Sequence, residues 1–208
     1  VPPEQGSQVV AAFKARQLVA FLDTAYQGFG DGIREDGAVV TAFLDAGLEF
    51  LVATSFSKSF SLYGERVGAL SVVCADAQAC QRVLSQLKVA IRTNYSNPPT
   101  FGAQIVTTVL TTPALRTMWE EELAAMRQRI RRMRESLVAG LKSAGVTKDL
   151  SYITRQKGMF SYSGLDKAQM ERLRTEFGVY GVDSGRICVA ALNERNLAHV
   201  VRAIVSVM

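Results

Sequence analysis

The chain has 208 residues, of which 48% are hydrophobic and 21% charged, and its formal net charge is +5. These values are ordinary for a soluble globular protein of one large or two small domains. No apolar segment approaches the ~18 residues that span a bilayer, and three cysteines without a CxxC pair argue against a disulfide framework or a zinc site, so we expect a cytoplasmic protein.

The first part of the chain alternates helix-like and strand-like segments. Residues 7–17 and 41–49 have the apolar spacing of amphipathic helices. Short apolar runs predict buried strands at residues 18–23, 50–54 and 67–74. Near-continuous apolar strands that alternate with helices indicate an α/β layer in which both faces of the sheet are covered.

The longest predicted helix covers residues 113–143. Apolar residues recur there at intervals of three, four and seven, and Pro113 suits a first helical turn. A helix of this length spans about 45 Å, which suits a connector between two domains. We therefore expect domains at residues 1–112 and 144–208, and a loop at residues 90–102, where two prolines are adjacent.

The last part of the chain mixes short strands and helices. Residues 158–164 and 186–192 are strand-like. Helix-capping residues predict where the helices of this part begin and end. They are Asp166 with Gln169 three positions later, Gly178 at the end of that helix, and Asn193 before the last helix.

Basic residues concentrate at residues 127–137, which read RQRIRRMRESL. A helix of this kind can bind nucleic acid or anionic lipid, but it is more often a solvated helix face. No base-reading motif accompanies it, so we expect an exposed face, with neither nucleic acid nor a membrane as a partner. His199, the only histidine, falls off the apolar stripe of the last helix, and we expect it to be exposed and not catalytic.

Lys58 lies in an unusual setting, SFSKSFSLYGERVG, directly after the predicted strand at residues 50–54. Desolvation and a neighbouring cation both favour the neutral, nucleophilic form of an amine, and such an amine forms a Schiff base with an aldehyde. Ser55, Ser57 and Arg66 offer hydroxyls and a guanidinium that suit a phosphate. An aldehyde and a phosphate on one small molecule describe pyridoxal phosphate.

A carboxylate is needed to keep the ring nitrogen of that cofactor protonated. Asp23 ends a strand that the pattern predicts to be buried, and Tyr26 follows three residues later as a donor for the ring oxygen. The alternatives are ordinary ones: a solvent-facing lysine at a strand end and an aspartate in a turn or cap. These residues by themselves leave both interpretations open.

Several segments, in order, resemble the class I aminotransferases of fold type I, the aspartate and aromatic aminotransferase group. They are FLDTAYQGF, SFSKSFSLYGERVG, NYSNPPTFGAQIV, GMFSYSGL, EFGVY and SGRICVAAL. The resemblance covers nearly all of the chain and is to the C-terminal half of the family. It implies part of a large α/β domain, with a mainly parallel sheet and helices on both faces, followed by a smaller α+β domain.

The resemblance also implies a role for each site residue. Lys58 is the catalytic residue, which binds the cofactor covalently and moves the substrate proton. The implied cofactor-binding residues are Asp23, Tyr26, Ser55, Ser57, Lys58 and Arg66, and the implied substrate-binding residues are Arg186 for the α-carboxylate, Arg92 for a side-chain carboxylate and Phe160 for the pocket wall. No metal is implied.

The expected activity is transfer of an amino group from phenylalanine or tyrosine to 2-oxoglutarate by a ping-pong mechanism, because SFSLYGERVGALSVVC looks more like the aromatic enzymes. The alternatives are an aspartate aminotransferase and a non-catalytic module that keeps the fold segments. The family's enzymes are homodimers about twice this long, so we expect a piece of a longer chain that does not turn over on its own.

Overall fold

The computed structural model describes residues 3–208, which form two compact units. Unit 1 comprises Gly32–Glu122 together with the residues up to Gly28, and unit 2 comprises Phe29–Asp31 and Leu123–Met208. The division falls inside a 31-residue helix, α6 (Pro113–Ser143), whose limits are those predicted. The domain limits at residues 112 and 143 remain a prediction.

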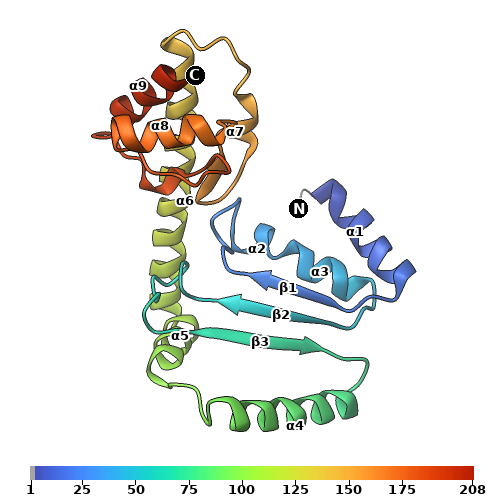
Figure 1. Cartoon of the computed structure of the whole chain (residues 1–208). Coiled ribbons are helices and arrows are strands. Elements are labelled where there is room, and N and C mark those ends of the chain that lie inside the picture. Colours follow the sequence, from blue (N-terminus) through green and yellow to red (C-terminus); the bar gives the residue numbers. More distant parts are fainter. Residues whose placement is uncertain (1–2) are drawn as a thin grey trace. The chain divides into compact units, whose positions relative to one another are not determined.

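Unit 1 contains a three-stranded sheet and the helices that follow its strands (Figure 1). Its elements before α6 are α1 (Pro3–Arg16), β1 (Ala20–Thr24), α2 (Ile33–Asp36), α3 (Ala38–Asp45), β2 (Phe50–Ser55), β3 (Gly68–Val73), α4 (Ala77–Asn94) and α5 (Phe101–Thr111).

The strand order is β1-β2-β3, with one parallel and one antiparallel pair. β1 and β2 are parallel, and helices α2 and α3 make the crossover between them, as parallel pairing requires. β3 returns antiparallel to β2, with Ser55 opposite Gly68. The α/β class is confirmed. The consequence for function is that the carboxyl ends of β1 and β2 and the amino end of β3 meet at one edge of the sheet.

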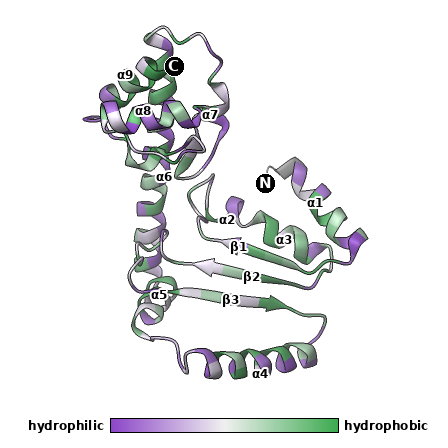
Figure 2. Cartoon of the chain, viewed as in Figure 1, coloured by the Kyte–Doolittle hydropathy of each residue, from purple (hydrophilic) through white to green (hydrophobic). Residues whose placement is uncertain are grey.

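The core of unit 1 lies between one face of this sheet and helices α1 and α3. Phe43 of α3 and Phe50 of β2 are each 1% exposed, with ring centroids 5.5 Å apart. Phe13 of α1 meets Phe43 edge-on at 5.3 Å. Figure 2 shows the resulting apolar character of α3 and β1. Burial of these aromatic rings, at about 25 cal/mol per Å² of apolar surface, is what holds the two helices on the sheet.

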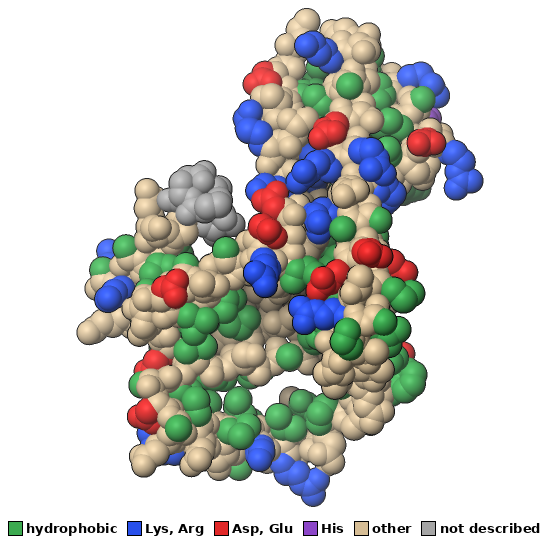
Figure 3. Space-filling view, turned by 180° about the vertical axis from the view of Figure 1, so that it is seen from behind, with side chains coloured by type: hydrophobic (Ala, Val, Ile, Leu, Met, Phe, Trp, Pro, Cys, Tyr) green, Lys and Arg blue, Asp and Glu red, His purple; other side chains and the backbone are tan. Residues whose placement is uncertain are grey.

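The opposite face of the sheet is more open. Phe21 and Leu70 are on this side, and their exposed fractions are 64% and 48%. On the molecular face seen in Figure 3, hydrophobic side chains are likewise visible over the unit that holds the sheet. The apolar strand pattern predicted that both faces of the sheet are buried. Among the described residues, only the face that packs against α1 and α3 is covered.

The loop predicted at residues 90–102 is wrong at both ends. α4 continues through Asn94 and α5 begins at Phe101, so the irregular part is short. The amino end of α4 is fixed by Asp76, whose carboxylate accepts from the backbone N–H of Ala79 at 2.7 Å. The adjacent prolines lie in the short gap between the two helices. The sequence pattern predicted a loop longer than this gap.

Unit 2 packs short elements around the second part of α6. They are α7 (Ser151–Arg155), β4 (Phe160–Tyr162), α8 (Lys167–Phe177), β5 (Arg186–Cys188), a short 3-10 helix (Val189–Ala191) and α9 (Leu197–Val207). Leu137, Met170, Leu173 and Val189 are fully buried, which shows that the core joins α6, α8 and the strand region. β4 and β5 form an antiparallel pair.

The predicted caps of α8 are confirmed. The Asp166 carboxylate accepts from the Gln169 N–H at 2.9 Å, while the Gln169 side chain accepts from the Asp166 N–H at 3.0 Å. Gly178 ends the helix with a φ of 65°, in the left-handed region that favours glycine. Reciprocal local hydrogen bonds of this kind are readable from sequence because they need no distant partner.

The prediction for the last helix is wrong in its cap. α9 begins at Leu197 after Asn196, whereas the Asn193 side chain accepts from the N–H groups of Arg195 and Asn196 and so closes the preceding turn. The strands predicted at residues 158–164 and 186–192 also shorten to three residues each. The second one ends because the chain turns into the 3-10 helix.

The thiols of Cys74, Cys80 and Cys188 are all free. Within residues 3–208, no helix combines the length and the apolar character that crossing a membrane requires.

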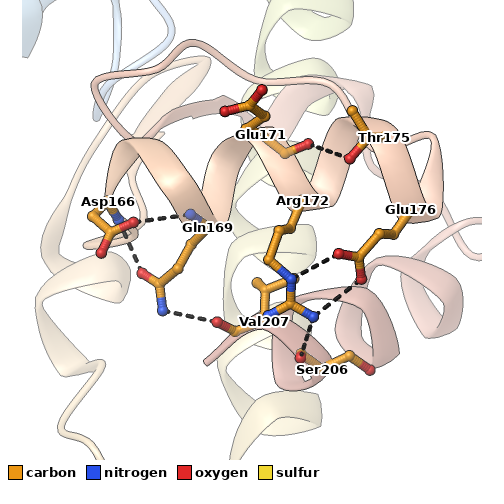
Figure 4. A network of polar contacts seen from close by, with 8 residues as sticks. All are labelled: Asp166, Gln169, Glu171, Arg172, Thr175, Glu176, Ser206 and Val207. Carbon is orange, nitrogen blue, oxygen red and sulfur yellow. Dashed lines mark hydrogen bonds and ion pairs between the residues drawn. The ribbon is translucent and has the colours of Figure 1, made fainter.

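Helix α8 holds the end of α9 through polar contacts (Figure 4). Arg172 donates to both carboxylate oxygens of Glu176, at 2.7 and 3.0 Å, and also to the Ser206 carbonyl at 3.4 Å. Gln169 donates to the Val207 carbonyl at 2.9 Å. The last carbonyls of α9, which lack partners within their own helix, are satisfied in this way.

The Arg172–Glu176 pair makes the stability of unit 2 depend on pH. The hydrogen bond from Arg172 lowers the pKa of Glu176 below its usual value of 4.5. A carboxyl with a lowered folded-state pKa stabilises the fold above the unfolded value, and this contribution is lost as pH falls through the folded value. We expect Glu176→Gln to lower the melting temperature at pH 7 by less than about 2 °C, because an exposed pair contributes little.

The difference between wild type and Glu176→Gln should shrink as the pH is lowered below 4.5. Glu171 provides the matched control on the same helix, because its backbone carbonyl accepts from the Thr175 hydroxyl while none of the described residues bonds to its carboxylate. Thermal unfolding followed by circular dichroism over a pH series measures both variants. An equal loss for Glu171→Gln would contradict the assignment to the Arg172 pair.

Candidate functional site

Lys58 lies in a tight turn directly after β2. The Phe60 N–H donates to the Phe56 carbonyl at 3.2 Å, and the Ser61 N–H donates to the Lys58 carbonyl at 3.2 Å. Ser57 is 7% exposed and Lys58 is half-buried. The Lys58 amine is therefore held on an ordered piece of backbone, close to solvent but partly withdrawn from it.

Trp119 of α6 supports this turn, and the sequence analysis did not identify it as a site residue. Its indole N–H donates to the Ser59 carbonyl at 2.7 Å, and its ring stacks on Phe60 with centroids 4.6 Å apart. Phe60 in turn meets Phe56 edge-on at 5.5 Å. One signal was available, because a half-buried indole N–H needs an acceptor and this is the only tryptophan in the chain. In the sequence, Trp119 is one of the regularly spaced apolar residues of the helix predicted at residues 113–143, and that spacing gives no sign of a hydrogen-bonding role.

Tyr26 is the residue that the structure brings against Lys58. The Lys58 Nζ lies 4.5 Å from the centroid of the Tyr26 ring, within the range of a cation–π contact. Both residues follow the carboxyl ends of neighbouring parallel strands, β1 and β2. The loop after Tyr26 is fixed as well, since the Gln27 amide donates to the Ile33 carbonyl at 2.9 Å and the Gly28 N–H to Asp36 Oδ2 at 2.8 Å.

Asp23 lies one residue before the end of β1, opposite Ala53 of β2. The prediction of a buried carboxylate is wrong: Asp23 shares the open face of the sheet with Phe21, and both are exposed. The strand ends are joined by Thr24, whose hydroxyl donates to the Ala53 carbonyl and lies 3.1 Å from the Thr54 hydroxyl. Asp23 is thus fixed at the same edge as Lys58 and available to a ligand.

Ser55, Ser57 and Arg66 also belong to this edge. The Ser55 hydroxyl accepts from the Ser57 N–H at 3.3 Å. Arg66 precedes β3 by two residues, has a φ of 54°, and donates from Nη1 to the Tyr63 carbonyl at 2.9 Å. Since β3 begins where β2 ends, the register of the two strands brings the arginine segment and the serine segment together. We call these six residues the edge site: Asp23, Tyr26, Ser55, Ser57, Lys58 and Arg66.

The remaining predicted substrate residues occupy other elements. Arg186 begins β5, as predicted, and its guanidinium carbon lies 5.0 Å from the ring centroid of Phe160 on the paired strand β4. This pair belongs to unit 2. Arg92 is on the last turn of α4 in unit 1, exposed, and donates to the Ser96 hydroxyl at 2.5 Å. His199 is exposed, as expected, with Nε2 2.9 Å from the Phe177 carbonyl.

Comparison with protein families places these features in a known group. The profile of the family described as "Aminotransferase class I and II" matches residues 1–204. An aspartate aminotransferase of Pseudomonas aeruginosa is 59% identical over 201 residues, which are 97% of this chain and 50% of that protein. An aromatic-amino-acid aminotransferase of Escherichia coli is 53% identical over 205 residues, 99% of this chain and 52% of that protein.

Solved structures agree. An aromatic-amino-acid aminotransferase from Burkholderia pseudomallei, covalently bound to pyridoxal phosphate, superposes with a TM-score of 0.98 at 59% identity. The match covers all of this chain and 52% of that one. A mitochondrial aspartate aminotransferase from Trypanosoma brucei has a TM-score of 0.96 at 40% identity, over 99% of this chain and 54% of that one. The chain therefore spans about half the length of the relatives it matches.

The support from Trp119 generates a prediction about the Lys58 turn. Trp119→Phe keeps an aromatic ring on Phe60 but removes the donor to the Ser59 carbonyl. The loss of one such hydrogen bond, about 1 kcal/mol, corresponds to roughly a fivefold to tenfold faster opening of the turn. Amide hydrogen exchange at Phe60 and Ser61 measures this opening.

The control for this prediction is the neighbouring residue on α6. Met118 is 57% exposed, so Met118→Leu should leave exchange at Phe60 and Ser61 unchanged. Equal acceleration in the two variants would show that helix α6 as a whole, not the indole hydrogen bond, holds the turn.

Proposed function

Because the chain belongs to the class I and II aminotransferase family, we propose that it provides the cofactor-binding lysine and its surroundings in a pyridoxal-phosphate aminotransferase. The donor is an aromatic amino acid and the acceptor is 2-oxoglutarate. The observation that carries the proposal is the contact of the Lys58 amine with the Tyr26 ring, at the sheet edge where Asp23 also lies.

The edge site fits pyridoxal phosphate in its chemistry. The cofactor has an aldehyde, a phosphate, a ring nitrogen and a ring oxygen, and bound it acts as an electron sink for charge that develops at the substrate Cα. The edge site offers an amine, hydroxyls with a guanidinium, a carboxylate and a phenol, all on segments joined by β1, β2 and β3. The solved relative from Burkholderia pseudomallei holds the same cofactor covalently.

Lys58 has two tasks in this proposal, to hold the cofactor through its amine and to carry the proton removed from the substrate Cα. Both need an amine whose position is set by the backbone, and the Phe56–Ser61 hydrogen bonds with the Trp119 support provide it. No histidine is needed for this proton transfer, which agrees with the exposed position of His199.

The other edge residues would orient the ring and the phosphate. The Asp23 carboxylate would pair with the protonated ring nitrogen, and the Tyr26 hydroxyl would donate to the ring oxygen. Arg66 and the hydroxyls of Ser55 and Ser57 would bind the phosphate, for which a guanidinium fork is well suited. Ser57 is already withdrawn from solvent, so part of the desolvation that phosphate binding demands is built into the fold.

Arg186 and Phe160 would bind the substrate. A guanidinium at the first residue of β5, resting on the Phe160 ring, is fixed in direction and can pair with an α-carboxylate in a bidentate manner. The aromatic ring of Phe160 beside it favours an apolar substrate side chain. Relatives named for aromatic amino acids, from Escherichia coli and Burkholderia pseudomallei, support this substrate class.

Aspartate is the alternative donor. The relative from Pseudomonas aeruginosa, at 59% identity, is an aspartate aminotransferase, and Arg92 supplies an exposed guanidinium for a side-chain carboxylate. The proposal for aromatic substrates requires that the Arg92 guanidinium moves aside when an apolar side chain binds. Its partner in this structure is the neutral Ser96 hydroxyl, and a hydrogen bond to a neutral group is easier to break than an ion pair.

The proposal includes a homodimer and a cytoplasmic location. The exposed position of Arg92 suits a residue that reaches a second subunit, and the open face of the sheet leaves apolar surface to be covered. Three free thiols fit a reducing compartment.

The test of the central assignment is Lys58→Ala. With pyridoxal phosphate added, the wild-type chain should develop a visible absorption band that differs from that of the free cofactor, and Lys58→Ala should abolish it, because no amine remains at the edge site. Lys88→Ala, at an exposed lysine on α4, is the matched control and should keep the band. A band that persists in Lys58→Ala would remove the assignment.

The substrate class is tested at Arg92 in the native enzyme. Arg92→Leu should lower kcat/KM for aspartate by about 10–100-fold, because the charge-assisted hydrogen bond to the side-chain carboxylate is lost. It should change kcat/KM for phenylalanine by less than about threefold. Arg82→Leu, at an exposed arginine on the same helix, should change neither. A wild-type enzyme that prefers aspartate would establish the alternative donor.

A further inference from the structure

Unit 2 contains a basic pocket of about 390 Å³ that the proposed transamination does not use. It is formed by the middle of α6, the end of α7 with the segment that follows it, and Phe29–Gly30. Its charged lining residues are Arg127, Arg131, Arg134, Glu135, Arg155 and Lys157. Lys and Arg side chains are prominent on this unit in Figure 3.

The pocket explains the basic stretch at residues 127–137 better than a solvated helix face does. Arg127, Arg131 and Arg134 are spaced four and three residues apart, so they project from one side of α6. Arg134 is only 4% exposed, and Arg129 donates to the carbonyls of Ala190 and Leu192 at 2.8 and 2.9 Å. The expectation of a wholly exposed basic face is therefore wrong.

Arg134 is the fixed point of the pocket. Its Nε donates to the Ser161 hydroxyl at 3.0 Å, and its Nη2 donates to the carbonyls of Gly158 and Phe160 at 2.6 and 3.2 Å. None of the described residues accepts a hydrogen bond from Nη1. Burial first, and then the positive charge of Arg131, lower the pKa of the Arg134 guanidinium. A bound anion would relieve this repulsion and accept from Nη1.

The charges around the pocket do not balance. Asp31 pairs with Arg131 at 3.3 Å and with Lys157, and Glu135 is the acidic residue in the lining. The lining itself contains five cationic side chains and one carboxylate, so positive charge predominates in it. Asp149 interacts with Arg155, which also donates to the Ser151 hydroxyl at 2.9 Å, but Asp149 is outside the lining.

We propose that this pocket binds a diphosphate group, either inorganic pyrophosphate or the diphosphate of a nucleotide. Guanidinium forks bind phosphate oxygens in pairs, and a lining with five cationic side chains and one carboxylate suits a polyanion better than a single carboxylate. The volume is within the range of small-ligand sites. Arg131, Arg155 and Lys157 are exposed and accessible to an incoming anion, while Arg134 is a buried residue of the lining.

The experiment is a calorimetric titration of the full chain with inorganic pyrophosphate, at constant ionic strength and without divalent cations. Arg131→Gln with Arg155→Gln should weaken binding at least about tenfold, because two phosphate partners are lost. The matched control is Arg132→Gln with Arg195→Gln, which removes the same charge from exposed arginines of unit 2 outside the lining. It should change the affinity less than about twofold.

A gain of affinity excludes a folding defect as the explanation. Asp31→Asn removes the carboxylate that competes for Arg131 and Lys157, and it should tighten pyrophosphate binding by about threefold or more. Equal losses in the two double variants, or weaker binding in Asp31→Asn, would overturn the proposal, since binding would then follow overall charge. Absence of saturable binding to wild type would overturn it too.

Two further arms identify the ligand and separate this pocket from the edge site. ADP that binds more tightly than pyrophosphate supports a nucleotide as the source of the diphosphate, and the reverse supports the free anion. Citrate that binds as tightly as both would overturn the choice of phosphate chemistry. Arg66→Gln should leave pyrophosphate affinity unchanged; if it abolishes binding, the anion occupies the edge site and the pocket proposal fails, whatever the outcome for transamination.

Discussion

The pairing of three strands is the constraint on which the candidate site depends. β1 and β2 run parallel and β3 returns antiparallel, so two strand ends and one strand start meet at one edge. Every residue of the edge site is within three residues of such an end or start. A slip of one residue in β1 would turn Asp23 to the other face of the sheet, because side chains alternate. Register, more than any single contact, therefore decides which functional groups can act together.

The Lys58 turn shows how a short segment depends on a distant one. The turn is closed by its own backbone hydrogen bonds, but its outer surface is held by Trp119, 60 residues further along the chain. The role proposed for this amine, to hold a cofactor and transfer a proton, requires a position fixed to within fractions of an ångström. Stacking of an aromatic ring together with one hydrogen bond supplies that rigidity without placing a charge next to the amine.

Two arginines of α6 have a structural role in unit 2. Arg129 donates to two backbone carbonyls that follow β5, and Arg134 donates to two carbonyls just before and at the start of β4. These bonds join α6 to the small strands. Arg134 is buried and Arg129 half-buried, and both guanidinium groups remain hydrogen-bonded, which lowers the cost of withdrawing such residues from water. The same packing that stabilises unit 2 leaves an excess of positive charge around the pocket.

By itself the sequence determined the elements with strong local signals: the full length of α6, the capped helix α8, the three strands of unit 1 and the motif around Lys58. Caps and helical periodicity depend on neighbours a few residues away, so they can be read from one chain. Only the tertiary structure decided the exposure of Asp23, the role of Trp119, the limits of α4 and the inward turn of Arg134. These depend on which surfaces meet across dozens of residues, and no local pattern encodes that choice.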